Sequence, residues 1–270
     1  MTSDLADNRA GRERLVGVSL KMYFGSQETL DWCARVGAIA DGHPAVASGM
    51  VRVFVLPTFP LLMPVIALLR DTAVEVGAQN LCSRDSGPFT GEVSGQVLAE
   101  LGCAYVAVGH AERRRLFGET DDEVALKVEA ALRNDLCPVV CVGEADPTDA
   151  ESAARECVRQ LHSALSRIRH DSMRDRVVVA YEPHWAIGAD SPAPDLHIAR
   201  VCAALQKSVR GARPAAADRV IYGGSAGPGL LERLGDSVDG LFLGRYVHDP
   251  VAFEAVLDEV GRITRHEAGN

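Results

Sequence analysis

Apolar runs rich in β-branched residues recur eight times along the chain, with more polar segments between them. The runs span residues 15–20, 51–56, 74–79, 104–108, 138–142, 177–181, 220–222 and 240–243. Nearly all are continuously apolar rather than alternating, which is typical of strands buried on both faces of a parallel sheet. We therefore expect eight parallel strands.

Segments between these runs place apolar residues every three or four positions, as amphipathic helices do. The spacing predicts helices over residues 122–135 and 150–169. A last helix is expected after Asp249, which can cap it, with Pro250 at the first helical position. Its inward stripe is expected to consist of Val251, Val256, Val260 and Ile263.

Strand and helix alternate from residue 15 to the end of the chain, which predicts an α/β protein with a single-domain, closed (β/α)8 barrel. An open, doubly wound sheet is the competing architecture. It is disfavoured because no early strand leads into a Gly-x-Gly-x-x-Gly turn and no Pro/Ser-rich linker divides the chain. We expect the barrel over residues 15–270, preceded by a polar extension over residues 1–14.

The composition narrows the class of protein further. The chain has 270 residues, of which 47% are hydrophobic and 24% charged, as in ordinary globular proteins. Its net charge of −9 argues against a nucleic-acid surface, which needs an excess of Lys and Arg.

Compartment can also be judged from the sequence. The most apolar stretch, residues 53–69, is interrupted by Pro57, Pro60 and Pro64 and is too short for a membrane helix. The polar residues 1–14 resemble neither a secretory signal nor an anchor, so a cytoplasmic location is expected. The seven cysteines are expected to be reduced, buried thiols.

Polar residues that end the apolar runs are the candidates for chemistry, because barrel active sites form at the carboxyl ends of the strands. Lys21 follows the first run, His110 the fourth and Glu182 the sixth, and glycine turns follow the last two. Each has a structural explanation of its own: a solvated strand end, a half-buried histidine, a capped turn. Together they supply a cation, a proton donor, a base and backbone N–H groups at one mouth.

Longer motifs around these positions resemble the triosephosphate isomerase family, in family order and over nearly the whole chain after the first dozen residues. They are Gly77-Ala78-Gln79-Asn80, Phe89-Thr90-Gly91-Glu92, Val108-Gly109-His110-Ala111-Glu112-Arg113-Arg114, Phe117-Gly118-Glu119, Cys141-Val142-Gly143-Glu144, Ala180-Tyr181-Glu182-Pro183 with Trp185-Ala186-Ile187-Gly188, and Tyr222-Gly223-Gly224-Ser225.

The resemblance implies an isomerase that moves a proton between neighbouring carbons through an enediol. Glu182 would be the base, and His110 a neutral imidazole that donates to the substrate oxygens. Lys21 would supply positive charge, with Glu112 holding it in place. Residues 183–191 would form a mobile lid that excludes water.

The resemblance also implies how a substrate phosphate is bound. Backbone N–H groups of Gly188, Ser225, Gly244 and Arg245 would hold it, at the usual phosphate site of the barrel. No metal and no organic cofactor are expected.

Five positions depart from the family pattern. Ser19 stands where the family has Asn, Ala111 where it has Ser, and His184 where it has an apolar residue. The lid continues as Gly188-Ala189-Asp190-Ser191 without the family's lysine, and Arg245 replaces a glycine, adding a guanidinium suited to phosphate.

The smaller Ser19 and Ala111 favour a substrate slightly larger than a triose phosphate. A tetrulose phosphate fits: paralogues in erythritol-type catabolism interconvert L-erythrulose 1-phosphate and D-erythrulose 4-phosphate by the same proton transfer. The bulk of Phe242 argues mildly against the larger substrate. The alternatives are a triosephosphate isomerase proper, and a non-catalytic barrel that binds a sugar phosphate.

The resemblance further implies a homodimer. Residues 80–92 would reach into the neighbouring subunit, with an apolar tip at Pro88-Phe89-Thr90. The alternative is a monomer whose loop packs on itself.

Overall fold

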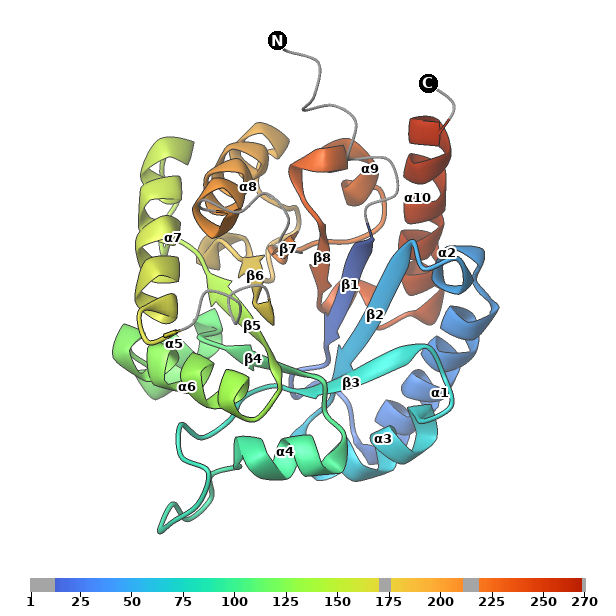
Figure 1. Cartoon of the computed structure of the whole chain (residues 1–270). Coiled ribbons are helices and arrows are strands. Elements are labelled where there is room, and N and C mark those ends of the chain that lie inside the picture. The colour runs from blue at the N-terminus through green and yellow to red at the C-terminus, as the bar shows by residue number, and fades with distance from the viewer. Residues whose placement is uncertain (1–12, 170–175, 211–218, 269–270) are drawn as a thin grey trace.

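The computed structural model describes residues 13–169, 176–210 and 219–268. In these ranges eight parallel strands close into a barrel in the order β1 to β8, with β8 pairing back to β1 (Figure 1). The strands are β1 (Arg14–Ser19), β2 (Val51–Leu56), β3 (Val74–Ala78), β4 (Tyr105–Val108), β5 (Cys137–Val142), β6 (Val178–Tyr181), β7 (Arg219–Tyr222) and β8 (Gly240–Leu243). The (β/α)8 prediction is confirmed.

Helices cover the outside of the barrel (Figure 1). They are α1 (Ser26–Gly42), α2 (Pro44–Ala47), α3 (Leu62–Leu69), α4 (Gly95–Leu101), α5 (Ala111–Phe117), α6 (Asp121–Arg133), α7 (Ala150–Leu165), α8 (Asp195–Arg210), α9 (Leu230–Leu234) and α10 (Pro250–Ala268). Short 3₁₀ turns lie between these elements: η1 (Phe59–Leu61), η3 (His184–Ala186), η4 (Gly235–Ser237) and η5 (Arg245–Val247). The two helices predicted over 122–135 and 150–169 correspond to α6 and α7.

Local capping explains where several helices begin. Thr120 and Glu123 form a reciprocal capping box at the start of α6, and Asp149 accepts N–H groups at the start of α7. Asp249 accepts the Val251 N–H at 3.0 Å with Pro250 at the first position of α10, as the sequence predicts.

One member of the predicted inward stripe of α10 is wrong. Val256 and Val260 are fully buried and Ile263 packs against the core, but the side chain of Val251 is 68% exposed. At 100° per residue, Val251 lies 180° from Val260, on the opposite face of the helix.

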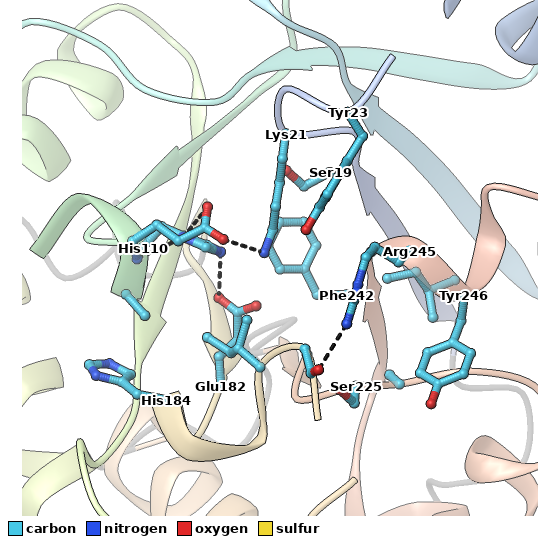
Figure 2. A pocket seen from close by; sticks show the side chains of 18 of the residues that line it. Ser19, Lys21, Tyr23, His110, Glu182, His184, Ser225, Phe242, Arg245 and Tyr246 are labelled. Atoms are coloured by element: carbon cyan, nitrogen blue, oxygen red, sulfur yellow. Dashed lines mark hydrogen bonds and ion pairs between the residues drawn. The ribbon is translucent and has the colours of Figure 1, made fainter. Parts of the chain in front are cut away.

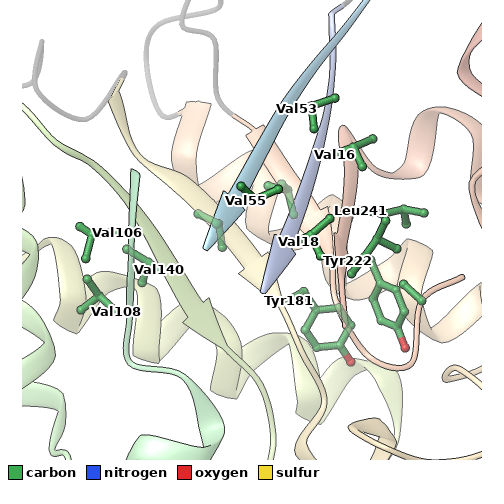
Figure 3. Close-up of a cluster of buried hydrophobic side chains, with 14 of the residues drawn as sticks. Val16, Val18, Val53, Val55, Val106, Val108, Val140, Tyr181, Tyr222 and Leu241 are labelled. Carbon is green, nitrogen blue, oxygen red and sulfur yellow. The ribbon is translucent and has the colours of Figure 1, made fainter. Parts of the chain in front are cut away.

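Alternate strand residues fill two separate apolar layers. Val16 and Val18 belong to the layer between strands and helices, which Figure 3 shows for several strands. Leu15, Phe54 and Phe242 belong to the barrel interior. Gly17 also points inward, where any Cβ would collide with the ring of Phe54, so its lack of a side chain lets that ring cross the barrel.

Other expectations concern the ends of the chain, the thiols and membranes. β1 begins at Arg14, one residue earlier than expected, and residues 1–12 of the predicted extension lie outside the described residues. All seven cysteines are free, and burial raises the pKa of Cys33 to about 12 and that of Cys103 to about 11. In the described ranges, no helix is long and apolar enough to span a bilayer.

Candidate active site

A cavity of about 320 Å³ opens at the carboxyl ends of the strands. All nine site residues predicted from the sequence line it (Figure 2). They are Ser19, Lys21, His110, Glu112, Glu182, Gly188, Ser225, Gly244 and Arg245. The barrel thus brings together residues that are more than 200 positions apart in the sequence.

His110 and Glu182 face each other across this cavity. His110 is the N-cap of α5, and its Nδ1 accepts the N–H of Glu112 at 3.2 Å. The neutral ring therefore carries its proton on Nε2, which lies 3.6 Å from Oε2 of Glu182. Both atoms are buried and neither has a hydrogen-bond partner among the described residues, so a donor and an acceptor are left for a ligand.

Lys21 is held at the cavity by its side chain and its backbone. Its Nζ lies 2.8 Å from Oε1 of Glu112. Its backbone has φ +48°, a left-handed conformation rare for residues other than glycine, and its carbonyl accepts a hydrogen bond from Gln79 Nε2 at 2.9 Å. Burial alone would raise the pKa of Glu112, but the ammonium of Lys21 lowers it below its usual value, so the ion pair persists.

The carboxylate of Glu182 packs against Gly223, which follows β7. A Cβ at residue 223 would lie 2.7 Å from both Cγ and Oε1 of Glu182. The glycine therefore leaves the space that the carboxylate occupies, and any larger residue would displace it.

The segment predicted to be a lid contributes to the wall of the cavity and is held there by hydrogen bonds. Ile187 and Gly188 line the cavity, and Glu182 is only 4% exposed. Ser225 Oγ donates to the carbonyls of Ala186 and Ala189 at 2.7 and 2.9 Å. The Ala193 N–H donates to the hydroxyl of Tyr222 at 3.0 Å.

Glu144, beyond the end of β5, anchors the first part of the lid. Trp185 Nε1 donates to Oε1 of Glu144 at 2.9 Å, the Tyr181 hydroxyl donates to both carboxylate oxygens, and the His184 N–H donates to the Glu144 carbonyl. The predicted lid is therefore held at its first residues by Glu144, and further along by Ser225 and Tyr222.

His184 lines the cavity beside this anchor (Figure 2). Burial lowers its pKa below the ordinary 6.5, and the positive charge of Arg114 lowers it further, outweighing the opposite effect of Glu144. The imidazole is therefore neutral at neutral pH.

The end of the cavity where the sequence predicts phosphate binding carries a positive charge, although the protein is acidic. Gly188, Ser225, Gly244 and Arg245 all line it. The Arg245 guanidinium, expected to pair with phosphate, donates from Nη2 to the Gly188 carbonyl at 2.8 Å.

Five lining residues were missed in the sequence, of which Tyr23, Arg115 and Tyr246 are polar and Ala226 and Leu243 apolar. Tyr23 and Tyr246 follow Lys21 and Arg245 closely in the chain, a signal that could have found them. Arg115 lies five residues after His110 on α5, and nothing in the sequence marks it. Within the described ranges, no cluster of three His, Cys, Asp or Glu side chains is placed to hold a metal ion.

Comparison with known proteins identifies the family. A model described as triosephosphate isomerase matches residues 14–260. The chain belongs to the triosephosphate isomerase family. The resemblance seen in the motifs is thereby confirmed for almost the whole chain.

Relatives in this family carry two different names. The chain is 52% identical over 250 residues to an L-erythrulose-1-phosphate isomerase of Pectobacterium atrosepticum, covering 93% of this chain and 96% of the relative. It is 37% identical to an L-erythrulose-1-phosphate isomerase of Mesorhizobium japonicum, with 85% and 90% covered. It is 36% identical to a triosephosphate isomerase of Moorella thermoacetica, with 92% and 98% covered.

Proposed function

We propose that this protein interconverts L-erythrulose 1-phosphate and D-erythrulose 4-phosphate in the catabolism of a tetritol. The observation that carries the isomerase chemistry is the facing pair of His110 Nε2 and Glu182 Oε2, both buried and both without a partner in the described part of the chain. A binding protein needs no buried base beside a proton donor, whereas proton transfer at carbon needs both.

The proposed reaction moves one carbon-bound proton. Glu182 removes the proton from C3, beside the C2 carbonyl, while His110 Nε2–H donates to the carbonyl oxygen. The electron pair of the C–H bond forms the C2=C3 bond of an enediol. Glu182 then returns the proton to C2, and the hydroxyl proton of O3 passes through His110, which leaves the carbonyl at C3 and regenerates both groups.

The rest of the cavity supports the charge changes of this reaction. Lys21, fixed by Glu112, places a positive charge beside the enediol oxygens. The N–H groups at Gly188, Ser225, Gly244 and Arg245 would bind the phosphate dianion. The closed lid excludes water and so strengthens each of these interactions.

The choice of a tetrulose over a triose rests on pocket size and on relatives. Ser19 and Ala111 line the cavity and are smaller than the residues that the family pattern has there. The extra hydroxymethyl group of the tetrulose replaces one hydrogen on the reacting carbon and needs such space. The name of the Pectobacterium relative, at 52% identity, supports the same choice.

The experiment compares kcat/KM for L-erythrulose 1-phosphate and dihydroxyacetone phosphate. We expect the tetrulose phosphate to be preferred by at least about tenfold, the order of discrimination that one extra group gives. A rate on the triose near the diffusional ceiling of ~10⁸ M⁻¹s⁻¹ would instead make the protein a triosephosphate isomerase. If neither substrate takes up deuterium from heavy water, the protein is a non-catalytic barrel that binds a sugar phosphate.

We also propose that the protein is a homodimer. The segment between β3 and α4 projects away from the barrel (Figure 1), and large apolar side chains are exposed, among them Met22 at 90% and Phe117 at 69%. Phe89, in the projecting segment, is also exposed. Such side chains are commonly covered by a partner. Analytical ultracentrifugation tests this; a monomer at micromolar concentration would contradict it.

A further inference from the structure

Two side chains of η5 reach across the cavity mouth to the middle of the lid. Arg245 Nη2 donates to the carbonyl of Gly188 at 2.8 Å (Figure 2). The hydroxyl of Tyr246 donates to the carbonyl of Asp190 at 2.8 Å. These contacts are separate from those of Ser225 with the carbonyls of Ala186 and Ala189, and from that of Tyr222, at the end of β7, with the N–H of Ala193 just after the lid.

The same short segment also belongs to the proposed phosphate site. Gly244 and Arg245 line the phosphate end of the cavity, and so does Gly188 on the lid. Gly188 has φ +75°, and a Cβ there would lie 3.2 Å from Nη2 of Arg245, so the guanidinium packs directly on this peptide. The lid peptide and η5 are therefore in contact at the point where a phosphate would bind.

Arg245 can join the lid and the ligand. A guanidinium has five N–H donors in a planar fork, and the structure assigns one to the Gly188 carbonyl. The others are available to a phosphate oxygen, in the paired geometry that Arg favours. A bound phosphate would restrict the rotamers of Arg245 and so reduce the entropy lost when it contacts the lid.

Both contacts are solvent-exposed, which makes them suited to a reversible closure. Exposed hydrogen bonds compete with water and contribute little each, so they shift an equilibrium between open and closed lids rather than lock it.

We propose that Arg245 and Tyr246 are positioning residues that clamp lid residues 188–190, and that a bound phosphate group strengthens the clamp. This rests on the proposed function, in which the lid must close for the proton transfer. Because Glu182 directly precedes the lid, a weaker clamp leaves the base less protected from water and lowers kcat more than it raises KM.

The lid can be observed without turnover through Trp185, whose indole is bonded to Glu144 at the base of the lid. The chain has two tryptophans, so biosynthetic 5-fluorotryptophan gives two ¹⁹F resonances, and a Trp185→Phe variant identifies the one from the lid. Inorganic phosphate is the titrant. In the wild type we expect the Trp185 resonance to move or sharpen as phosphate is added.

Three variants test the clamp. Tyr246→Phe should need about three- to tenfold more phosphate for the same ¹⁹F change, as expected for one hydrogen bond, and Arg245→Lys about tenfold or more. Tyr246→Phe should lower kcat for the ketose phosphate more than it changes KM, whereas Arg245→Lys, which also removes the paired contact with phosphate, should lower kcat and raise KM. Arg262 lies on α10, and Arg262→Ala, which removes an exposed ion pair with Glu232 of α9, should titrate as the wild type does.

The outcomes separate this proposal from the function. No phosphate-dependent change at Trp185 in the wild type, or Tyr246→Phe and Arg245→Lys variants that titrate normally, would overturn the clamp even if isomerisation is observed. If the ¹⁹F titrations give the expected differences but the protein isomerises no ketose phosphate, the proposed function is wrong and the clamp is still supported.

Discussion

Nε2 of His110 and Oε2 of Glu182 lie 3.6 Å apart, each buried and each outside the hydrogen-bond network of the described residues. The distance is too long for a hydrogen bond and suits two groups that meet on the same substrate. This arrangement costs stability when the cavity is empty, because buried polar groups without partners are unfavourable. It is the expected arrangement for a proton donor and a base whose hydrogen-bonding capacity is kept for a ligand.

Replacing Glu182 by glutamine should remove the base while keeping the shape of the side chain. We expect kcat for the ketose phosphate to fall by on the order of 10³, and the exchange of deuterium from heavy water into the substrate, followed by NMR, to fall in parallel. Glu151→Gln, on the exposed first turn of α7, is the matched control. Deuterium exchange at the wild-type rate in the Glu182 variant would assign the base to another residue.

Lys21→Ala should impair both binding and turnover, because in the proposed mechanism the ammonium contacts the substrate in the ground state and in the transition state. A decrease in kcat/KM on the order of 10² to 10³ is expected from steady-state kinetics. Glu112→Gln should have a smaller effect of the same sign, since it loosens Lys21 without removing its charge. The exposed Lys207→Ala provides the control, and a Lys21 variant that matches it would exclude the proposed role.

Gly223→Ala should displace the carboxylate of Glu182, because the added methyl would lie 2.7 Å from Oε1. We expect kcat to fall by about tenfold to a hundredfold, the cost of misplacing a catalytic group by about 1 Å, with the thermal midpoint nearly unchanged. A methyl added at Gly25 meets no atom within 4 Å, so Gly25→Ala controls for the substitution itself. Full activity in the Gly223 variant would contradict the packing described for Glu182.

Ser19→Asn should shift the preference between substrates. The larger side chain reduces the space beside the reacting carbons, so kcat/KM for L-erythrulose 1-phosphate should fall about 10- to 100-fold more than kcat/KM for dihydroxyacetone phosphate. Ala111→Ser should act in the same direction more weakly. If kcat/KM falls equally for both substrates, these two positions do not select for substrate size.

His184 should make stability depend on pH near neutrality. Its pKa in the folded protein lies below the ordinary 6.5, so the unfolded chain takes up a proton first as the pH falls through about 6.5. The preferential protonation of His184 in the unfolded chain lowers the free energy of unfolding progressively below pH 6.5, and this effect vanishes above about pH 7.5. Positive charges on Arg114 and Arg115 face the imidazole and oppose its protonation, whereas the carboxylate of Glu144 favours it.

His184→Asn should therefore lose less stability than the wild type between pH 7.5 and pH 5.5, as measured by thermal unfolding. His162→Asn, at an exposed position on α7, should follow the wild type. If the thermal midpoints of the wild type and the His184 variant change with pH in parallel, the imidazole does not resist protonation in the folded protein.

The positions of all eight strands could be predicted from the sequence to within one or two residues, since a strand buried on both faces must be apolar throughout. Helix positions were also predictable where capping residues mark them, as at Asp249. Val251 was misplaced because an apolar residue in the first turn was counted by its type rather than by its angle around the helix.

The site residues could be predicted for a different reason. Glu182, His110 and Lys21 each end a strand run and lie in long family motifs, so both topology and motif place them. The contacts of Arg245 and Tyr246 with the lid could not be predicted, since they depend on side-chain rotamers that bridge two loops brought together by closure of the barrel. Arg115 was missed because its nearness to the cavity depends on the orientation of α5.

Phe242 lines the cavity and also belongs to the aromatic stack that crosses the barrel interior, 6.1 Å from Phe54, which in turn stacks on Tyr105 at 4.2 Å. A smaller residue at 242 would open a void in the centre of the molecule, with a cost typical of deleting a buried aromatic ring. Divergence toward longer or shorter sugars is therefore constrained to the rim, at positions such as Ser19 and Ala111. New specificity in this lineage can arise there by single substitutions that leave the scaffold untouched.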